Sequence, residues 1–349
     1  MYTDQTIIVA KRNIRWLSFV LADITLIWSA FCFYIFNSWY GSFLGRETQL
    51  ALYGIACLYS VICIINNVRN RNNEDATSPG ATFISALGQI IGKLSSGDTG
   101  MPMFTDARHK TKFLFILVKL FFIPLMLQFT IGNSMELAHE IKRVMKTGMD
   151  GTVVLWFNNI FFPLAITSFF LIDTATFLFG YLFESDKLGN KLRSVDSSWS
   201  GWLVAIICYN PFNELLGKLA PHYANTYAYF DQSINGTFAL RLVIVLLLFV
   251  YTWASVSLGT RASNLTNRGI VAKGAYKIVR HPAYIAKVTA WWVMLIPLLS
   301  NNPMVVTGMF VWTIIYFLRA VTEERHLSQD ADYVAYCQKV KWRFIPGVY

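Results

Sequence analysis

The chain has 349 residues, of which 55% are hydrophobic and 16% aromatic but only 14% charged. Soluble domains carry about 25% charged residues, so this composition excludes an ordinary water-soluble globule. The charge is also unbalanced, with 30 Lys and Arg against 20 Asp and Glu and a formal net charge of +10. Such an excess is typical of binding to nucleic acid, of contact with anionic lipid, or of loops held on the cytoplasmic side of a bilayer.

Eight apolar segments are predicted to cross a membrane, because about 20 apolar residues span the hydrocarbon as a helix. Five are clear, at 16–36, 50–65, 113–131, 153–172 and 238–258. The segment 202–216 is short and interrupted by Pro211, so it is either re-entrant or dependent on neighbouring helices for its backbone hydrogen bonds. The last two, 284–299 and 304–321, are separated only by residues 300–303 and are predicted to form a tight helical hairpin. The expected fold class is an all-α, polytopic transmembrane protein.

The first of these segments is expected to be a retained helix and not a signal peptide. It is long, it contains Asp23, and it lacks a small-residue cleavage site.

The cationic residues are distributed unequally between the two sides of the predicted bilayer. Eight spans place both termini on one side, where the loops carry 22 of the 30 Lys and Arg, against 5 on the other side. Positively charged loops stay in the cytoplasm, so both termini are predicted to be cytoplasmic, in a bacterial inner membrane or the endoplasmic reticulum. This accounts for the surplus charge, and no nucleic-acid partner is expected. The 66–112 loop is expected to be partly irregular and to lie at the surface.

Five ionisable residues fall within the predicted spans: Asp23, Lys119, Asp173, Arg241 and Lys287. Such residues are costly in a membrane and mark candidate functional sites. All except Arg241 fall near the cytoplasmic ends of their helices, which predicts a polar cavity in that half of the membrane. Taken singly, the two lysines are explained by extension of their side chains to the head groups, and Arg241 is expected to be an anchor of this kind. The two aspartates are too short to extend, so each is expected to have a partner or a water-lined pocket.

Motifs of the common soluble enzymes are missing from the sequence, including the dinucleotide-binding and phosphate-binding loops and the zinc-protease and nucleophile-elbow signatures. No disulfide framework or metal site is expected either. Cys32, Cys57 and Cys63 lie in apolar segments, and Cys208 and Cys337 lack the spacing of metal ligands.

Polar, aromatic and Gly/Pro residues are concentrated in the C-terminal third, beginning with residues 274–284. Pro282 is suited to the first position of a helix and biases His281 toward an extended conformation. Arg280 and His281 are therefore expected at the mouth of the seventh span, beside free backbone N–H groups and the positive end of the helix dipole. Such a position favours a carboxylate or a phosphate.

The eighth span is followed by Glu323 and Glu324. Successive helical residues point about 100° apart, so only one of the two is expected to face any single ligand, while the other pairs with Arg319 or faces solvent. A tail that mixes cations with aromatic residues, 333–349, comes next. The hairpin brings both motifs to one face, so anion-binding groups, carboxylates and aromatic rings are predicted to converge at the cytoplasmic boundary.

These residues together resemble a known group of enzymes. Gly-x-Tyr-x-x-x-Arg-His-Pro-x-Tyr at 274–284, the Glu-Glu-x-x-Leu at 323–327 and a tail with Tyr-x-x-Tyr and Arg-x-Ile-Pro are similar to the integral-membrane methyltransferase superfamily of isoprenylcysteine carboxyl methyltransferases and phospholipid N-methyltransferases. The resemblance covers residues 260–349. Ala275 stands where family members often have Pro.

The resemblance implies that the hairpin and the tail enclose S-adenosylmethionine at the cytoplasmic face, while a lipid or lipidated acceptor enters from the bilayer. It implies that the cofactor pocket is lined by Tyr276, Arg280, His281, Pro282, Tyr284, Glu323 and Glu324. The expected division of the chain is an N-terminal region of about six spans, 1–259, which shapes the acceptor side, and a cofactor-binding region, 260–349.

Roles for the cofactor-binding residues follow from the resemblance. Glu323 or Glu324 is expected to bind the ammonium of the methionine moiety or to lie near the sulfonium, and Arg280 to bind the carboxylate. Tyr276, Tyr284 or a tail aromatic residue is expected to cover the adenine.

Roles at the acceptor depend on its chemistry, which the sequence leaves open. A carboxylate acceptor needs no general base, and Arg343 is expected to orient it, so Glu323 and Arg343 are the expected catalytic residues. An amine acceptor would need deprotonation, by His281, a tail glutamate or water.

Two other classes of function remain open. The C-terminal tail also resembles that of the sterol C14/C7 reductases, which use NADPH, but Pro282 and the paired glutamates favour the methyltransferase. The third class is a lipid-binding or transport protein without enzymatic activity. Stabilisation by S-adenosylmethionine, by NADPH or by neither would separate the three.

Overall fold

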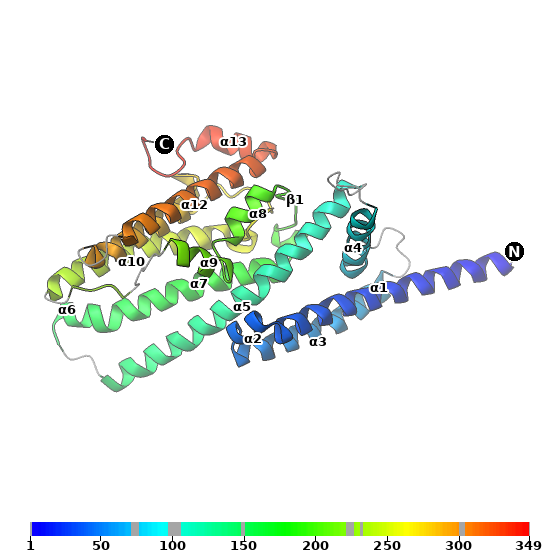
Figure 1. The fold of residues 1–349 in the computed structure, drawn as a ribbon, viewed down its shortest axis with the longest axis horizontal. Helices are drawn as coiled ribbons and strands as arrows, with labels where there is room; N and C mark the ends of the chain where they lie inside the picture. The colour runs from blue at the N-terminus through cyan, green and yellow to red at the C-terminus, as the bar shows by residue number, and fades with distance from the viewer. Residues whose placement is uncertain are drawn as a thin grey trace. The chain divides into compact units, whose positions relative to one another are not determined.

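The computed structural model describes residues 2–70, 77–96, 106–147, 151–220, 227–230, 233–299 and 304–348 (Figure 1). The chain forms two compact units, Met1–Pro124 and Leu125–Tyr349. Helix α5 (Ala107–Thr147) contributes to both, because the division falls at Pro124 inside it.

Six helices in the described part of the chain are long and apolar enough to cross a membrane. They are Ile14–Phe36, Arg46–Arg69, Ala107–Lys146, Val153–Leu182, Ile234–Arg261 and Met304–Leu327. Six of the eight predicted spans correspond to these helices, which confirms a multi-pass, all-α membrane protein. The other two correspond to shorter helices described below.

The first unit contains α1 (Tyr2–Phe36), α2 (Ser38–Phe43), α3 (Arg46–Arg69), α4 (Pro79–Ser95) and the first part of α5. Helix α1 packs against α3 and α4. Asn37 separates α1 from α2, and its Oδ1 accepts hydrogen bonds from the backbone N–H groups of Trp39 and Tyr40, which caps α2.

Asp23 joins three helices of this unit, which confirms the prediction that it has partners. Its Oδ1 accepts hydrogen bonds from the hydroxyl of Ser78 at 2.7 Å and from the backbone N–H of Gly80 at 2.6 Å, both at the start of α4. Its Oδ2 lies 3.3 Å from Cys63 Sγ and 3.4 Å from Asn67 Nδ2 on α3. The carboxylate therefore caps the N-terminus of a neighbouring helix, where negative charge is stabilised.

Helix α4 lies within the segment 66–112, which was expected to be partly irregular; residues 71–76 and 97–105 of that segment lie outside the described residues. It is a helix of 17 residues, capped by the Ser78 side chain and beginning with Pro79. A Ser-Pro start of this kind is a helix signal that could have been recognised in the sequence.

The second unit begins with the last part of α5 and a long helical segment made of α6 (Val153–Trp156), a π-helical turn (Phe157–Phe161) and α7 (Phe162–Leu182). Helix α7 lies beside α10 (Ile234–Leu258), which in turn packs against α11 (Pro282–Leu295) (Figure 1). The core of these three helices includes Phe162, Ile166, Ile244 and Leu248.

Helix α12 (Met304–Leu327) completes the predicted hairpin with α11 and is followed by α13 (Ala331–Lys339). Leu295 of α11 and Met309 and Trp312 of α12 belong to one buried cluster. The four connecting residues, 300–303, lie outside the described residues. Helix α11 continues into a 3₁₀ turn, Ile296–Leu298, and is shorter than the other candidate spans.

The predicted span at 202–216 is two short helices, α8 (Trp199–Ile206) and α9 (Phe212–Leu219). The N-cap of α8, Ser198, accepts a hydrogen bond from Arg325 near the end of α12. Beyond α9, the carbonyl of Ala220 accepts one from the Trp312 indole in the middle of α12, at 3.2 Å. The pair of helices therefore runs along α12, which fits the second of the two alternatives that the sequence left open, a segment that depends on neighbouring helices.

Arg241 differs from the predicted head-group anchor. Its guanidinium donates hydrogen bonds to the carbonyls of Asn158, Tyr227 and Ala228, at 2.9 to 3.2 Å, and lies over the Phe162 ring. Arg241 thereby links the start of α10 to the turn before α7 and to the segment after α9. Its guanidinium is bound by backbone carbonyls of the protein and not by lipid head groups.

The loops at the α7 exit form a small ordered platform. Strand β1 (Ser194–Val195) pairs in antiparallel register with β2 (Thr266–Asn267), Ser194 opposite Asn267. Three 3₁₀ turns, Asp186–Leu188, Gly259–Arg261 and Gly274–Lys277, complete it. Gly180 allows the close approach of α7 to this platform, because a Cβ there would meet the carbonyl oxygen of Ala262.

Candidate functional site

The second unit encloses a cavity of about 430 Å³. Residues of α5, α7, α10, α11, α12 and the junction between α8 and α9 line it. Asp173 of α7 and Lys287 of α11 are among them, so the cavity reaches two of the four charged residues from which the sequence predicted it; Asp23 and Lys119 do not line it.

Four of the predicted cofactor-binding residues line this cavity: Tyr276, His281, Tyr284 and Glu323. The other predicted site residues, Arg280, Pro282, Glu324 and Arg343, are not among its lining residues. They lie behind it and hold its wall together, as described next.

Pro282 starts α11 as predicted, and His281 precedes the helix with a φ of −126°. The backbone N–H groups of Arg280 and His281 donate hydrogen bonds to the carbonyls of Trp342 and Arg343, both at 2.9 Å. Two backbone amides that immediately precede the helix are therefore bound to the C-terminal tail. The tail is thereby fixed along the mouth of α11.

The two neighbouring glutamates have different environments, as the helical spacing predicted. Glu323 is exposed to the cavity, and its Oε2 accepts a hydrogen bond from the Tyr284 hydroxyl at 2.6 Å. Glu324 is only 6% exposed. Its Oε2 accepts a hydrogen bond from Arg343 Nε at 2.8 Å, and its Oε1 lies 3.1 Å from His281 Nε2.

Arg280 is the third partner of Glu324, with Nη1 3.3 Å from Oε1. The same guanidinium contacts the Cys337 thiol at 3.3 Å and the Lys341 carbonyl at 3.3 Å. Burial opposes its charge, but the contacts with Cys337 and Glu324 outweigh burial and raise the pKa of Arg280. Glu324 thus pairs with residues of the mouth and the tail, and not with Arg319.

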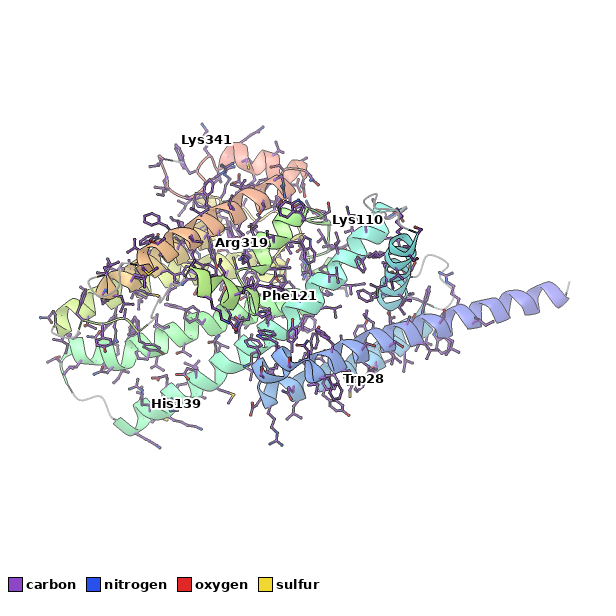
Figure 2. The ribbon with its side chains drawn as sticks, in the orientation of Figure 1. Trp28, Lys110, Phe121, His139, Arg319 and Lys341 are labelled. Carbon is purple, nitrogen blue, oxygen red and sulfur yellow. The ribbon has the colours of Figure 1, made fainter. Side chains whose placement is uncertain are left out.

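Arg319 is a cavity residue that the sequence analysis did not assign to the site (Figure 2). It is 7% exposed, and its guanidinium lies 5.3 Å from the ring centroid of Tyr284, 5.5 Å from that of Tyr209 and 5.8 Å from that of Tyr316. It donates a hydrogen bond to Asn264 Oδ1. No carboxylate in the described part of the chain lies within ion-pair distance of it, so the cavity holds a buried cation without an anionic partner.

At the deep end of the cavity, Asp173 accepts hydrogen bonds from the hydroxyls of Tyr251 at 2.7 Å and Ser255 at 2.5 Å. Lys287 lies 5.2 Å from the ring centroid of Trp291, 5.4 Å from that of Tyr251 and 5.7 Å from that of Tyr316. Asp173 therefore has the partners that were predicted. Lys287 is directed into a cage of aromatic rings that lines the cavity.

The turn between α12 and α13 is held to the platform by Asp330. Its carboxylate accepts hydrogen bonds from Arg193 at 2.8 Å and from Asn267 at 2.7 Å. Burial alone would raise the pKa of Asp330, but these hydrogen bonds outweigh it and lower the pKa. His326, on the last turn of α12, lines the cavity and lies 2.9 Å from the Ser194 hydroxyl.

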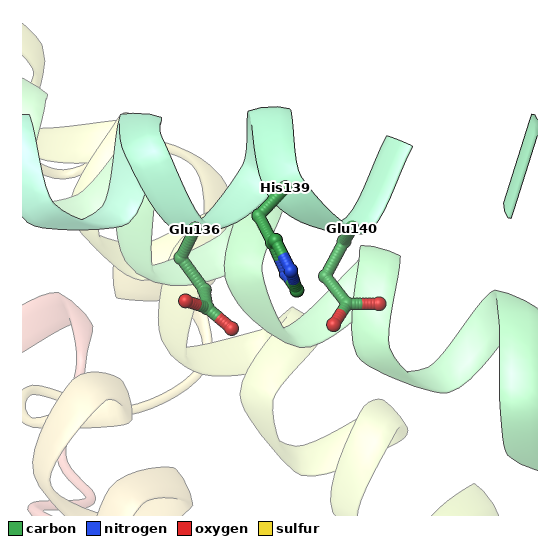
Figure 3. A group of neighbouring side chains, drawn as sticks. All are labelled: Glu136, His139 and Glu140. Atoms are coloured by element: carbon green, nitrogen blue, oxygen red, sulfur yellow. The ribbon is translucent and has the colours of Figure 1, made fainter. Parts of the chain in front are cut away.

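A separate group of possible metal ligands lies on α5, where Glu136, His139 and Glu140 point to one side of the helix (Figure 3). Their ligand atoms lie within 4.8 Å of one another. Arg143 already donates two hydrogen bonds to Glu140, at 2.6 and 2.8 Å. The guanidinium already supplies positive charge to this carboxylate, and we assign no metal role to these residues.

Comparison with known proteins bears on one part of the chain. Residues 238–329 match the family model of the isoprenylcysteine carboxyl methyltransferase (ICMT) family. The match runs from the start of α10 to the end of α12 and so includes every predicted site residue except Arg343. It confirms the resemblance to the integral-membrane methyltransferases and, with the apolar helices, supports a membrane methyltransferase. No curated protein and no solved structure matches the chain.

Proposed function

We propose that this protein transfers a methyl group from S-adenosylmethionine to a lipid or lipidated acceptor at the cytoplasmic face of its membrane. The observation that carries the proposal is the difference between the two glutamates. Glu324 is buried among Arg280, His281 and Arg343, whereas Glu323 is presented to a cavity that also contains the buried cation of Arg319.

The residues of the cavity fit the chemical groups of this cofactor. Its amino-acid end carries an ammonium and a carboxylate, for which Glu323 and Arg319 offer one anion and one cation. Its adenine is a flat aromatic ring, which Tyr276 or Tyr284 can cover. We assign the carboxylate to Arg319 in preference to Arg280, because Arg280 is engaged with Glu324 and the tail.

S-Adenosylmethionine supplies the methyl group as part of a positively charged sulfonium. The protein's own contribution is to bind and to orient. The Tyr284 hydroxyl fixes the carboxylate of Glu323 at the wall of the cavity. The aromatic rings around Arg319 shield its guanidinium from water. Holding two reactants in line supplies a large part of the rate of such a displacement.

We assign Arg343, Arg280, Pro282 and Glu324 to positioning. Arg343 and Arg280 bind Glu324, and the tail carbonyls bind the amides before Pro282. The wall of the cavity is therefore built from both ends of the C-terminal region, 260–349. On this proposal, the spans within 1–259 form the acceptor side.

We also propose eight membrane crossings with both termini in the cytoplasm, in a bacterial inner membrane or the endoplasmic reticulum. Helix α8 begins beside Arg325, near the C-terminal end of α12. After α9, Tyr227 accepts a hydrogen bond from Arg241, near the N-terminal end of α10. On the proposed topology these two helix ends lie on opposite sides of the membrane. A path between these two points crosses the membrane although neither helix does so alone. With α11, this adds two crossings to the six long helices and keeps the termini on one side.

Titration of labelled S-adenosylmethionine against the purified protein tests the proposed function. We expect wild type to bind it and to gain thermal stability from it but not from NADPH, the cofactor that the sterol-reductase resemblance of the tail implies. Glu323→Gln should weaken binding, while Glu136→Gln, an exposed glutamate of α5, should not. Absence of binding to wild type, or stabilisation by NADPH, would refute the assignment.

A further inference from the structure

We propose that Lys287 determines acceptor specificity by binding an anionic oxygen group of the acceptor, a carboxylate or a phosphate. The inference rests on the proposed function and adds the chemical class of the group that enters from the membrane. Its starting point is the position of Lys287 in the wall of the cavity, among the rings of Tyr251, Trp291 and Tyr316.

The ammonium of Lys287 has three N–H donors. Its contacts within the described part of the chain are with the faces of the three rings. Ring faces stabilise a cation by about 0.5–2 kcal/mol, but they supply no oxygen acceptor for the N–H groups. The structure therefore presents a cation with unused hydrogen-bond donors to a cavity inside the apolar part of the protein.

Asp173 does not neutralise this cation by direct contact. Its two carboxylate oxygens accept hydrogen bonds from Tyr251 and Ser255, and no ion pair within 4 Å joins it to Lys287. It acts instead on the cage, because the bond from the Tyr251 hydroxyl fixes that ring beside the ammonium. The site is thus organised before any ligand arrives, which lowers the entropy loss on binding.

The position of Lys287 along α11 separates it from the cofactor end of the cavity. It follows Tyr284 by three residues, so it lies on the same face of the helix and about 4.5 Å further into the membrane. Tyr284 itself binds Glu323 at the mouth. A group held by Lys287 would therefore lie on the membrane side of the proposed cofactor, where the acceptor must be.

The charge of Lys287 selects among acceptors. An ammonium attracts a carboxylate or phosphate and repels an acceptor whose only charge is a protonated amine. In the carboxylate case, an acceptor oxygen forms a bond to the methyl carbon, the carbon–sulfur bond breaks, and its electron pair stays on sulfur. The opposite charges cancel, no proton is released, and the neutral ester loses its attraction to Lys287.

Direct binding tests this inference without depending on turnover. The probes are an S-prenylated N-acetylcysteine with a free carboxylate, its neutral carboxamide, and phosphatidylethanolamine, each titrated in detergent while tryptophan fluorescence is recorded. We expect wild type to bind the carboxylate at least about tenfold more tightly than the carboxamide, the size of one charged hydrogen bond. Lys287→Met should abolish this difference, and Lys287→Arg should retain most of it.

Lys119→Met is the matched control, because Lys119 also lies in a span and over an aromatic ring, that of Phe115 at 4.6 Å, but is not among the residues that line the cavity. It should leave probe binding unchanged. Lys287-dependent binding of phosphatidylethanolamine in place of the carboxylate would support the proposal with phosphate as the anion. Equal binding of carboxylate and carboxamide by wild type together with phosphatidylethanolamine binding that does not depend on Lys287, or full carboxylate binding by a folded Lys287→Met protein, would overturn it.

S-Adenosylmethionine binding is measured on the same variants and separates this inference from the proposed function. We expect Lys287→Met to bind it as wild type does, since Lys287 contacts aromatic rings and makes no hydrogen bond to Glu323 or Arg319 in the described part of the chain. When methyl transfer can be followed, Lys287→Met should raise the KM for the acceptor about tenfold or more. Probe binding that depends on Lys287 without any binding of S-adenosylmethionine would reject the proposed function and leave the anion site standing.

Discussion

The two adjacent glutamates should respond in opposite ways to the same substitution. Glu324→Gln removes the charge that holds Arg280, His281 and Arg343 together, so we expect it to destabilise the protein. Glu323→Gln removes a charge from the cavity and leaves the packing unchanged. It should lower affinity for S-adenosylmethionine without lowering the stability of the free protein.

The size of the first effect follows from the contacts of Glu324. A hydrogen bond to a charged group contributes about 1.5–3 kcal/mol, and loss of one partner of a buried ion pair costs about 3–5 kcal/mol. The side chain of Arg343 is 25% exposed, so solvent compensates part of this loss. We expect Glu324→Gln to lower the free energy of unfolding by about 3 kcal/mol, which corresponds to a fall in Tm of about 6–12 °C on the scale of soluble domains of about 150–250 residues.

The size of the second effect comes from one charged contact with the ligand. Loss of about 2 kcal/mol raises the Kd by about 30-fold. Since Glu323 is exposed in the free protein, its substitution should change the free energy of unfolding by less than about 0.5 kcal/mol.

Thermal unfolding in detergent and equilibrium binding of labelled S-adenosylmethionine measure the two effects on the same preparations. The double variant Glu324→Gln/Arg343→Met provides the control, because it removes both partners of one contact. Its destabilisation should be smaller than the sum of the two single changes. If Glu324→Gln leaves Tm unchanged, or if Glu323→Gln lowers Tm and binds normally, the division of roles between the two residues is wrong.

Three further predictions concern other parts of the second unit. Gly180→Ala should lower Tm, because its Cβ meets a backbone carbonyl and overpacking costs about 1–3 kcal/mol; Gly132→Ala, where nothing lies within 4 Å, is the control, and equal Tm values for the two would contradict the packing described. The hydrogen bonds from Arg193 and Asn267 lower the pKa of Asp330 in the folded protein. Their contribution to stability should therefore be complete above the pKa of about 3.9 that this carboxyl group has in the unfolded chain, and it should be lost as the pH falls through the lower pKa of the folded state. Tm measured between pH 3 and 7 should show this loss in wild type but not in Asp330→Asn, and parallel curves would reject it. Arg319→Gln should raise the Kd for S-adenosylmethionine about tenfold or more, because it removes the buried cation. An unchanged Kd would show that Arg319 does not bind the carboxylate of the cofactor.

Hydrophobicity alone predicted the long helices, because a run of about 20 apolar residues has few alternatives to crossing a membrane. It could not describe α8 and α9, whose course depends on contacts with Trp312 and Arg325. Helix α4 was not predicted, because the polar residues on both sides of it indicated a loop, although Ser78 and Pro79 form a helix start.

The chemistry of the site was only partly readable from the sequence. The 100° step along a helix predicted that one glutamate would face a ligand, but not which one. That choice depends on Arg343, which reaches Glu324 only because the tail folds back. Arg319 was missed because a cation at the end of a span usually extends to the head groups. Its burial comes from rings such as Tyr209 and Tyr284, which are far from each other in the sequence.

On the proposed topology, in which α8 and α9 together make one crossing, the division of that crossing has a consequence for how the protein is made. Each helix has 8 residues and is about 12 Å long, against about 30 Å of hydrocarbon, so neither is recognisable as a span when it leaves the ribosome. The two helices are held by hydrogen bonds from α12 to Ser198, Ser200 and Ala220. Helix α12 is synthesised about a hundred residues later. On that topology, we expect this part of the chain to wait at the membrane surface or in the insertion machinery until α12 arrives, so that the order of insertion differs from the order of synthesis.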